Sequence, residues 1–271
     1  MSATLATSRI ERPACNTCAV KAHCLASSVE KENQLKFESS RMDMRVMRKG
    51  QHVYRAGDEF EALYIVRSGA VKATAISEDG TEQVTGFYLP GEIFGMDGIA
   101  PGEYTSNAIL LETSSVCVYS FSRLLDVCQE SAGLQRQLWH QVSLELASRQ
   151  RMLMTMGHRS AEARLAEFLM SLSLRFKRIG YSATSFNLPM SRQDIADYLG
   201  LSVETVCRVL TRFQKAGTLQ RDQREITLMN VEALQALSIG TLETRIPRSH
   251  DSENVSKARF HGSNEYAAAA S

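Results

Sequence analysis

Residues 191–217, SRQDIADYLGLSVETVCRVLTRFQKAG, restrict the fold of this 271-residue chain more than any other segment. Ser191, followed three positions later by Asp194, is typical of a capping box that starts a helix, and Gly200 is suited to ending that helix. A second helix then follows, in which Val206 is placed to pack against the first. This spacing predicts a helix-turn-helix. The alternative is an ordinary pair of antiparallel helices.

The region from about Met47 to Phe121 has a different pattern. The runs LYIV, AVKATAI, EQVTGFYL and SVCVYSF are rich in β-branched and aromatic residues, and pairs such as Ser-Gly, Asp-Gly and Pro-Gly separate them. Many short strands divided by turns predict an antiparallel roll or barrel. From about Ser122 onward the periodicity becomes helical.

A row of positions within residues 133–157 has the spacing of a coiled-coil seam. Its members are separated by alternating steps of four and three, and they are Val142, Leu146, Arg149, Leu153 and Met156. The pattern predicts a long helix that pairs with a second copy of the chain, with one arginine in the seam. The alternative is a helix packed on its own domain, with that arginine extending to solvent.

Three cysteines lie close together near the start of the chain, in the sequence CNTCAVKAHC. Cys15, Cys18 and Cys24 could surround one metal centre, and Cys117 is a candidate for a fourth ligand. Zinc and an iron–sulfur cluster both suit four thiolates, and the spacing does not separate them. Taken alone, Cys117 could equally be a small apolar residue of a core strand. Cys128 is expected to be structural.

Composition and the N-terminal residues argue against a membrane protein and against a secreted protein. The chain is 44% hydrophobic and 23% charged, as in soluble proteins, and its length suits about two domains. No apolar run reaches the roughly 18 residues of a membrane span, and no secretory signal precedes the first cysteine. We therefore expect a cytoplasmic protein, no membrane partner, and cysteines that bind metal rather than form disulfides.

The distribution of charge predicts a polyanionic partner. Residues 1–148 contain 14 Lys and Arg against 18 Asp and Glu, whereas residues 149–224 contain 13 against 6. The basic region includes the predicted helix-turn-helix, which favours double-stranded DNA.

The second helix of this motif has one face that could enter the major groove. Glu204, Cys207 and Arg208 share it; arginine can bond guanine with two hydrogen bonds, and glutamate can accept one from cytosine. Four basic residues are better placed for phosphates: Arg192, Arg212, Lys215 and Arg221. The segment LQRDQREITL after them predicts a β-hairpin wing. A homodimer would read an inverted repeat, with half-sites one helical turn apart.

This order of roll, long helix and winged helix-turn-helix resembles the CRP–FNR family of bacterial transcription regulators over about residues 15–238. The spacing CNTC-x5-C, the remote Cys117 and the sequence VETVCR resemble the FNR branch, the oxygen-responsive regulators of fumarate and nitrate reduction. The resemblance implies an α+β fold with a cyclic-nucleotide-binding-like β-roll. It implies four parts: a cluster-binding segment (1–40), the β-roll (41–125), a dimerisation helix (126–160) and a winged helix-turn-helix (161–238). Residues 1–14 and the tail (239–271), which lacks periodicity, are expected to be disordered.

The resemblance also implies a function. A [4Fe–4S] cluster on Cys15, Cys18, Cys24 and Cys117 would promote dimerisation and binding to a TTGAT–ATCAA repeat under low oxygen, and its loss in air would switch the protein off. The family motif is Glu-x-x-Ser-Arg, and Cys207 replaces the serine. Because a thiol is a weaker hydrogen-bonding group than a hydroxyl, we expect the outermost T·A pairs to be read more loosely.

The same resemblance implies that RNA polymerase contacts the loop at Asp79, Gly80 and Thr81, although a plain hairpin turn would give the same residues. Two other regulators on this fold are possible, one that binds a cyclic nucleotide and one stabilised by zinc. The chain has Gly91-Glu92, but residues 101–106 lack the arginine that a cyclic phosphate needs, so no cyclic nucleotide is expected. No acid–base group for catalysis emerges either, so the chain is not expected to be an enzyme.

Overall fold

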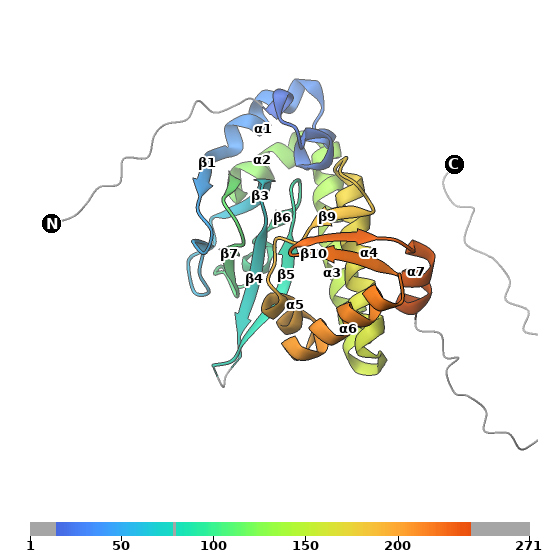
Figure 1. The fold of residues 1–271 in the computed structure, drawn as a ribbon. Helices are drawn as coiled ribbons and strands as arrows, with labels where there is room; N and C mark the ends of the chain where they lie inside the picture. Colours follow the sequence, from blue (N-terminus) through green and yellow to red (C-terminus); the bar gives the residue numbers. More distant parts are fainter. Residues whose placement is uncertain (1–14, 78–79, 240–271) are drawn as a thin grey trace, which may run out of the picture. The chain divides into compact units, whose positions relative to one another are not determined.

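The computed structural model describes residues 15–77 and 80–239 (Figure 1). The two end segments for which the sequence predicts disorder, 1–14 and the tail beyond 239, lie outside these residues, and so does Asp79.

The cysteine segment, residues 15–40, is a chain of short helices on the outside of the β-roll. It contains η1 (Cys15–Thr17), η2 (Lys21–His23), η3 (Leu25–Ser28), η4 (Lys31–Asn33) and α1 (Gln34–Ser40). Leu25 and Phe37 are almost fully buried and anchor it. The segment passes so close to Gly91 that a Cβ at this glycine would lie 3.0 Å from the carbonyl oxygen of His23. The segment is therefore packed onto the roll rather than attached only by its chain ends.

The predicted antiparallel roll is confirmed. One four-stranded sheet has the order β1 (Arg41–Met47), β8 (Ser114–Ser120), β3 (Ala62–Ser68), β6 (Ile93–Phe94). The other has the order β2 (His52–Tyr54), β7 (Asn107–Leu110), β4 (Val71–Ile76), β5 (Glu82–Tyr88), and η5 (Met96–Gly98) follows β6 in the chain. Aromatic side chains fill the space between the sheets, where Tyr54 stacks on Tyr104 with ring centroids 3.9 Å apart.

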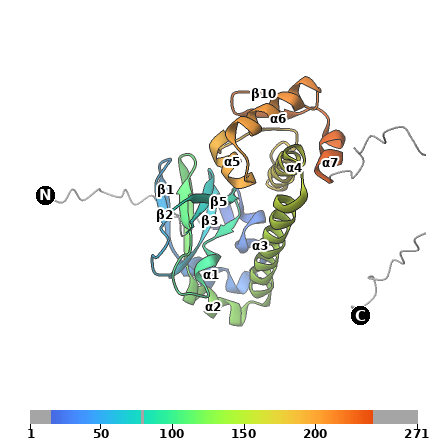
Figure 2. The same cartoon turned by 90° about the horizontal axis from the view of Figure 1, so that it is seen from below.

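The helical stretch after the roll is two helices rather than one. α2 (Phe121–Glu130) ends where the backbone of Ser131 becomes extended, and α3 (Ala132–His158) starts directly after it. The hydroxyl of Ser131 accepts the backbone N–H of Leu134 and caps α3. Figure 2 shows α3 as the long helix that leads from α2 toward α4.

The helix-turn-helix and its wing are confirmed. The C-terminal domain, residues 161–239, contains α4 (Ala161–Arg178), β9 (Ser185–Asn187), α5 (Arg192–Leu199), α6 (Val203–Lys215), β10 (Leu219–Asp222), β11 (Glu225–Leu228) and α7 (Val231–Ile239). Ser191 and Asp194 form the capping box of α5, and Gly200 ends that helix in the left-handed conformation, with φ of 61°. The predicted hairpin is β10–β11, and β9 adds a third strand to it.

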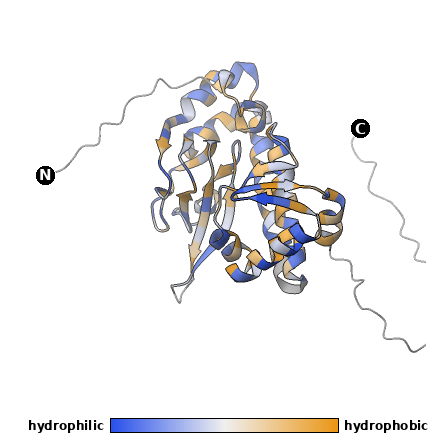
Figure 3. Ribbon diagram, viewed as in Figure 1, coloured by the Kyte–Doolittle hydropathy of each residue, from blue (hydrophilic) through white to orange (hydrophobic). Residues whose placement is uncertain are grey.

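The helix α6 has one apolar face, and this face packs inward as the sequence predicts. Val206, Val209, Leu210 and Phe213 are buried, and polar side chains occupy the opposite side, so the ribbon in Figure 3 carries both hydrophobic and hydrophilic colours. Among the described residues, no helix is both long and apolar enough to cross a membrane.

Candidate functional site

The structure brings the four candidate ligand cysteines together from distant parts of the sequence. Cys15, Cys24 and Cys117 are buried in one core cluster, and Cys18 is partly exposed. Burial raises the pKa of Cys24 to about 12, and Cys15, Cys18 and Cys117 add to this rise. The other three thiols thus lie near that of Cys24.

Cys117 and Cys128 are both buried in this core cluster, on different elements. Cys117 lies in the middle of β8, paired with Met44 on one side and Ile65 on the other. The pKa of Cys117 is raised to about 11 by burial, against a lowering effect of Arg41. Cys128, on α2, has its pKa raised by burial alone.

The metal-binding prediction stays a prediction, and the structure shows only whether these residues suit a metal centre. In the part of the chain that the structure describes, no three or more His, Cys, Asp or Glu side chains are arranged as ligands of a metal ion. By residue type, four neighbouring thiols nevertheless suit a tetrathiolate centre.

Two polar residues that the sequence did not predict contact these thiols. Arg41 Nη1 lies 3.6 Å from Cys15 Sγ, and the hydroxyl of Tyr119 lies 3.6 Å from the same sulfur. Arg41 and Tyr119 are directly opposite each other on β1 and β8. Only the strand pairing reveals this relation, because 78 residues separate the two positions in the sequence.

The cysteine segment also holds the start of α3. The carboxylate of Glu30 accepts the backbone N–H of Gly133 at 2.9 Å and the hydroxyl of Ser131. Asn33 donates to the carbonyl oxygen of Glu130 at 3.0 Å. A negative charge at a helix N-terminus is stabilising. The position of the cysteine segment is therefore coupled to the position of α3, a link for which the sequence contains no local signal.

The predicted seam on α3 is exposed in the single chain. Val142, Leu146 and Leu153 are 39%, 58% and 72% exposed. Met156 belongs to α3, but its side chain is outside the described part of the structure. Trp139 is 68% exposed and stands three positions before Val142, so it extends the same row. The spacing alone could have identified this tryptophan.

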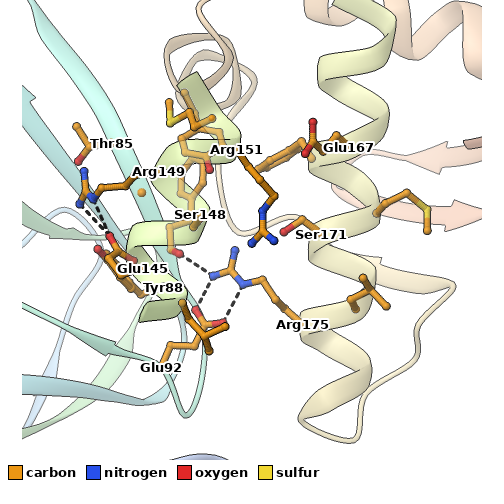
Figure 4. Close-up of a pocket in the computed structure, with 18 of the residues that line it drawn as sticks. Thr85, Tyr88, Glu92, Glu145, Ser148, Arg149, Arg151, Glu167, Ser171 and Arg175 are labelled. Carbon is orange, nitrogen blue, oxygen red and sulfur yellow. Dashed lines mark hydrogen bonds and ion pairs between the residues drawn. The ribbon is translucent and has the colours of Figure 1, made fainter. Parts of the chain in front are cut away.

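Arg149, the charged member of the seam, is already paired. Its Nη2 lies 2.8 Å from Glu145 Oε1 on the same helix, as Figure 4 shows. Burial lowers the pKa of Arg149, but the neighbouring Glu145 carboxylate raises it by more, so the pKa lies above its usual value. Part of the charge expected at the seam is therefore neutralised within one chain.

Glu145 and Arg149 line a cavity of about 500 Å³ between β5, α3, α4 and α5 (Figure 4). Glu92, from the Gly-Glu motif, lies in its wall and pairs with Arg175 of α4, whose Nε is 2.8 Å from Glu92 Oε1. Arg175 also donates to the carbonyl oxygen of Phe87 at 2.6 Å. The Glu92 carboxylate thus forms part of the contact between the roll and the C-terminal domain.

The predicted base-reading residues share an accessible face of α6. Glu204 and Arg208 are exposed over 87% and 61% of their side chains, with a loose ion pair of 3.9 Å between them. Cys207 is partly exposed, and its carbonyl oxygen accepts the hydroxyl of Thr211 at 2.8 Å. A 3.9 Å pair between exposed groups is weak, so both side chains are available to another partner.

Three of the predicted phosphate-binding residues are engaged within the chain. Arg192 donates to the carbonyl oxygen of Gln223 at 3.2 Å, and Arg221 donates to Gln214 at 3.0 Å. Arg212 pairs with Glu162 of α4. Lys215, the fourth, is exposed at the end of α6. To bind a DNA phosphate as predicted, Arg212 must first release the carboxylate of Glu162.

The predicted polymerase loop is the turn between β4 and β5. Gly80 and Thr81 are exposed there, and the carbonyl oxygen of Thr81 accepts the backbone N–H of Ser77 at 3.0 Å.

A β-roll joined through a long helix to a winged helix-turn-helix defines a DNA-binding transcription regulator, and comparison with known proteins agrees. Residues 44–131 match the family model described as cyclic nucleotide-binding domain, and residues 163–237 match the Crp-like helix-turn-helix domain. The transcriptional activator protein anr of Pseudomonas aeruginosa is 38% identical over 243 residues, which cover 90% of this chain and 100% of that protein.

Two further comparisons place the chain within the family. The fumarate and nitrate reduction regulatory protein of Salmonella typhimurium is 39% identical over 83% of this chain and 90% of its own length. The solved structure of FixK2 from Bradyrhizobium japonicum is 32% identical, with a TM-score of 0.65, over 72% of this chain and 96% of that one. The chain belongs to the FNR branch of the CRP–FNR family; it is a transcription regulator and not an enzyme.

Proposed function

We propose that this regulator senses oxygen through a [4Fe–4S] cluster held by Cys15, Cys18, Cys24 and Cys117. Bound there, the cluster would supply an oxygen-sensitive link between the cysteine segment and β8. With the link intact, the protein forms a homodimer and binds an inverted repeat similar to TTGAT–ATCAA. In air the link is lost and binding ends.

The observation that carries this proposal is the convergence of the four thiols at the place where the cysteine segment packs on the roll. Cys15 and Cys18 lie near enough to contribute to the raised pKa values of both Cys24 and Cys117, and Cys117 contributes to that of Cys24, although 93 residues separate Cys24 from Cys117. A centre that binds all four would therefore fasten the segment to β8. Since Glu30 joins the same segment to the start of α3, such fastening would hold α3 in place.

The pairing surface would be the exposed row on α3. A row of exposed apolar side chains on a single chain, here interrupted by Arg149, is typical of a protein–protein interface. Two copies paired along it would present two α6 helices to DNA. Glu204, Cys207 and Arg208 would then read bases in each half-site, while Arg192, Arg212, Lys215 and Arg221 contact phosphates.

Two contacts support the absence of a cyclic nucleotide from this mechanism. Glu92 is bound to Arg175, so its carboxylate is not available to a ligand. The segment 101–106 is tied to a carboxylate, because Thr105 Oγ1 and Ser106 Oγ donate to Asp97 Oδ2 at 3.0 Å and 2.8 Å. A carboxylate at that place repels a phosphate.

Activation would further require RNA polymerase, for which the exposed turn at Gly80 and Thr81 is available. The cytoplasm would be the compartment, because a cluster on thiolates needs reducing surroundings.

An absorption spectrum of the anaerobically purified protein tests the proposal. We expect a broad visible band that air bleaches, its loss in Cys117→Ser, and its retention in the matched variant Cys128→Ser. A colourless protein that contains zinc would contradict the proposal and favour a zinc-stabilised regulator.

A further inference from the structure

Arg41 is a charged residue in a place where charged residues are rare. Its exposure is 7%, and it stands at the first position of β1, against the cysteine segment. A buried guanidinium is costly unless anionic or strongly accepting groups surround it. The identity of its neighbours therefore indicates what the site is built to hold.

Those neighbours are sulfur atoms. Arg41 Nη1 lies 3.6 Å from Cys15 Sγ, and its side chain is also close enough to Cys117 to interact with that thiol. One guanidinium thus bridges a cysteine of the N-terminal segment and a cysteine of the roll. Tyr119, opposite Arg41 on the neighbouring strand, places its hydroxyl 3.6 Å from Cys15 Sγ. Arg41 and Tyr119 together give the sulfur atoms two buried hydrogen-bond partners.

Neutral thiols are poor partners for a buried cation, because a thiol is only a weak acceptor. Thiolates are strong acceptors, and cysteine binds metal as the thiolate. Hydrogen bonds between ionised groups are about twice as strong as neutral ones. The arrangement around Arg41 is therefore favourable when Cys15 and Cys117 carry negative charge.

We propose that Arg41 is the fixed counterion of the cysteine centre, a positioning residue that holds the Cys15 and Cys117 sulfurs together and sets the redox behaviour of the group they bind. This inference rests on the proposed function. Charge and N–H···S hydrogen bonds around a cluster tune its reduction potential. A nearby positive charge stabilises the more negative state of a one-electron couple, so Arg41 raises the midpoint potential and disfavours oxidation.

The test is a redox titration of the anaerobically reconstituted full-length protein, followed by its rate of bleaching in air. We expect Arg41→Gln to lower the equilibrium constant for reduction about tenfold, which corresponds to about 59 mV for one electron. Bleaching should be several-fold faster. Arg41→Lys should restore most of both properties, because it keeps the charge.

Arg45→Gln is the matched control. Arg45 lies on the same strand, its side chain is 46% exposed, and it pairs with Asp43 at the surface. This variant should leave the midpoint potential and the bleaching rate unchanged. Tyr119→Phe, which removes only the hydroxyl next to Cys15, should lower the potential by less than Arg41→Gln does.

The outcomes separate this inference from the function on which it rests. An Arg41→Gln protein that assembles no cluster while Arg41→Lys does would support the counterion role. Equal potentials and bleaching rates in wild type and Arg41→Gln would overturn the inference alone. Failure of both Arg41→Gln and Arg41→Lys to assemble a cluster would also overturn it, because Arg41 would then act only through packing. A wild-type protein without a cluster would overturn the proposed function and this inference together.

Discussion

At the scale of single residues, Cys207 distinguishes the proposed DNA-reading face of this chain from the Glu-x-x-Ser-Arg pattern. It is partly exposed between Glu204 and Arg208. We expect Cys207→Ser to strengthen discrimination at the outermost T·A pairs about fivefold to tenfold, at the low end of the roughly 1–3 kcal/mol of one base contact. Binding of half-site variants by wild type and Cys207→Ser measures this, with Cys128→Ser as the control. An outer-base preference already at full strength in wild type would show the expectation to be wrong.

Asp194 gives a pH-dependent prediction at the same scale. Burial raises its pKa, but hydrogen bonds from Lys72 and Ser191 outweigh this and leave the pKa below its usual value of 3.8. A carboxylate with a lowered pKa stabilises the fold at pH values above its unfolded pKa, and this stabilisation is lost as the pH falls through its folded pKa. Asp194→Asn should therefore cost about 1–2 kcal/mol at neutral pH, as the loss of a helix cap does.

Urea unfolding of wild type and Asp194→Asn between pH 7 and pH 3 checks this prediction. The difference in unfolding free energy should shrink as the pH drops below the usual aspartate pKa of 3.8. A difference that stays constant over this range would mean that Asp194 acts through packing rather than charge.

At the scale of elements, α3 is only marginally suited to pairing, because Arg149 interrupts its apolar row. Two arginines facing each other across a dimer axis repel, although Glu145 at 2.8 Å reduces the repulsion. Arg149→Leu should therefore give a dimer that persists in air. Glu145→Gln, which leaves the arginine unpaired, should weaken the dimer. Sedimentation in air and under nitrogen measures both changes, and an air-exposed Arg149→Leu protein that is still monomeric would contradict this account of the seam.

At the scale of the whole molecule, two ion pairs join the roll to the C-terminal domain. Lys72 Nζ lies 2.7 Å from Asp194 Oδ1, and Arg175 binds Glu92 and the carbonyl oxygen of Phe87. Tyr198 of α5 also packs against Phe87 of the roll, with ring centroids 5.1 Å apart. These contacts couple the roll to the helix that carries the capping box, so the two domains are expected to unfold together.

Arg175→Gln should break this coupling. Removing one partner of this partly buried pair leaves the other group without its hydrogen bonds, and we expect a loss of about 1–3 kcal/mol and separate unfolding of the two domains. Calorimetry would then show two transitions. Arg178→Gln, three positions later on α4 and exposed, is the control and should keep one transition. A single, unshifted transition in Arg175→Gln would contradict the coupling.

The parts of this molecule that the sequence predicted are those with local signals. Turn residues and β-branched runs indicate the roll, and Ser191, Asp194 and Gly200 indicate the helix-turn-helix from the sequence alone. Arg41 and Glu30 had no such signal. Their roles depend on β1 pairing with β8 and on the cysteine segment lying over the start of α3, which only the folded chain reveals.

Sedimentation of one sample, first anaerobic and then exposed to air, tests the central claim most directly when absorbance is recorded in the same cell and a TTGAT–ATCAA duplex is present. The account predicts a coloured, DNA-bound dimer that becomes a colourless monomer free of DNA after exposure. Cys128→Ser should behave as wild type, and Cys117→Ser should be colourless and monomeric from the start. The same oligomeric state and the same DNA binding before and after air would contradict the account.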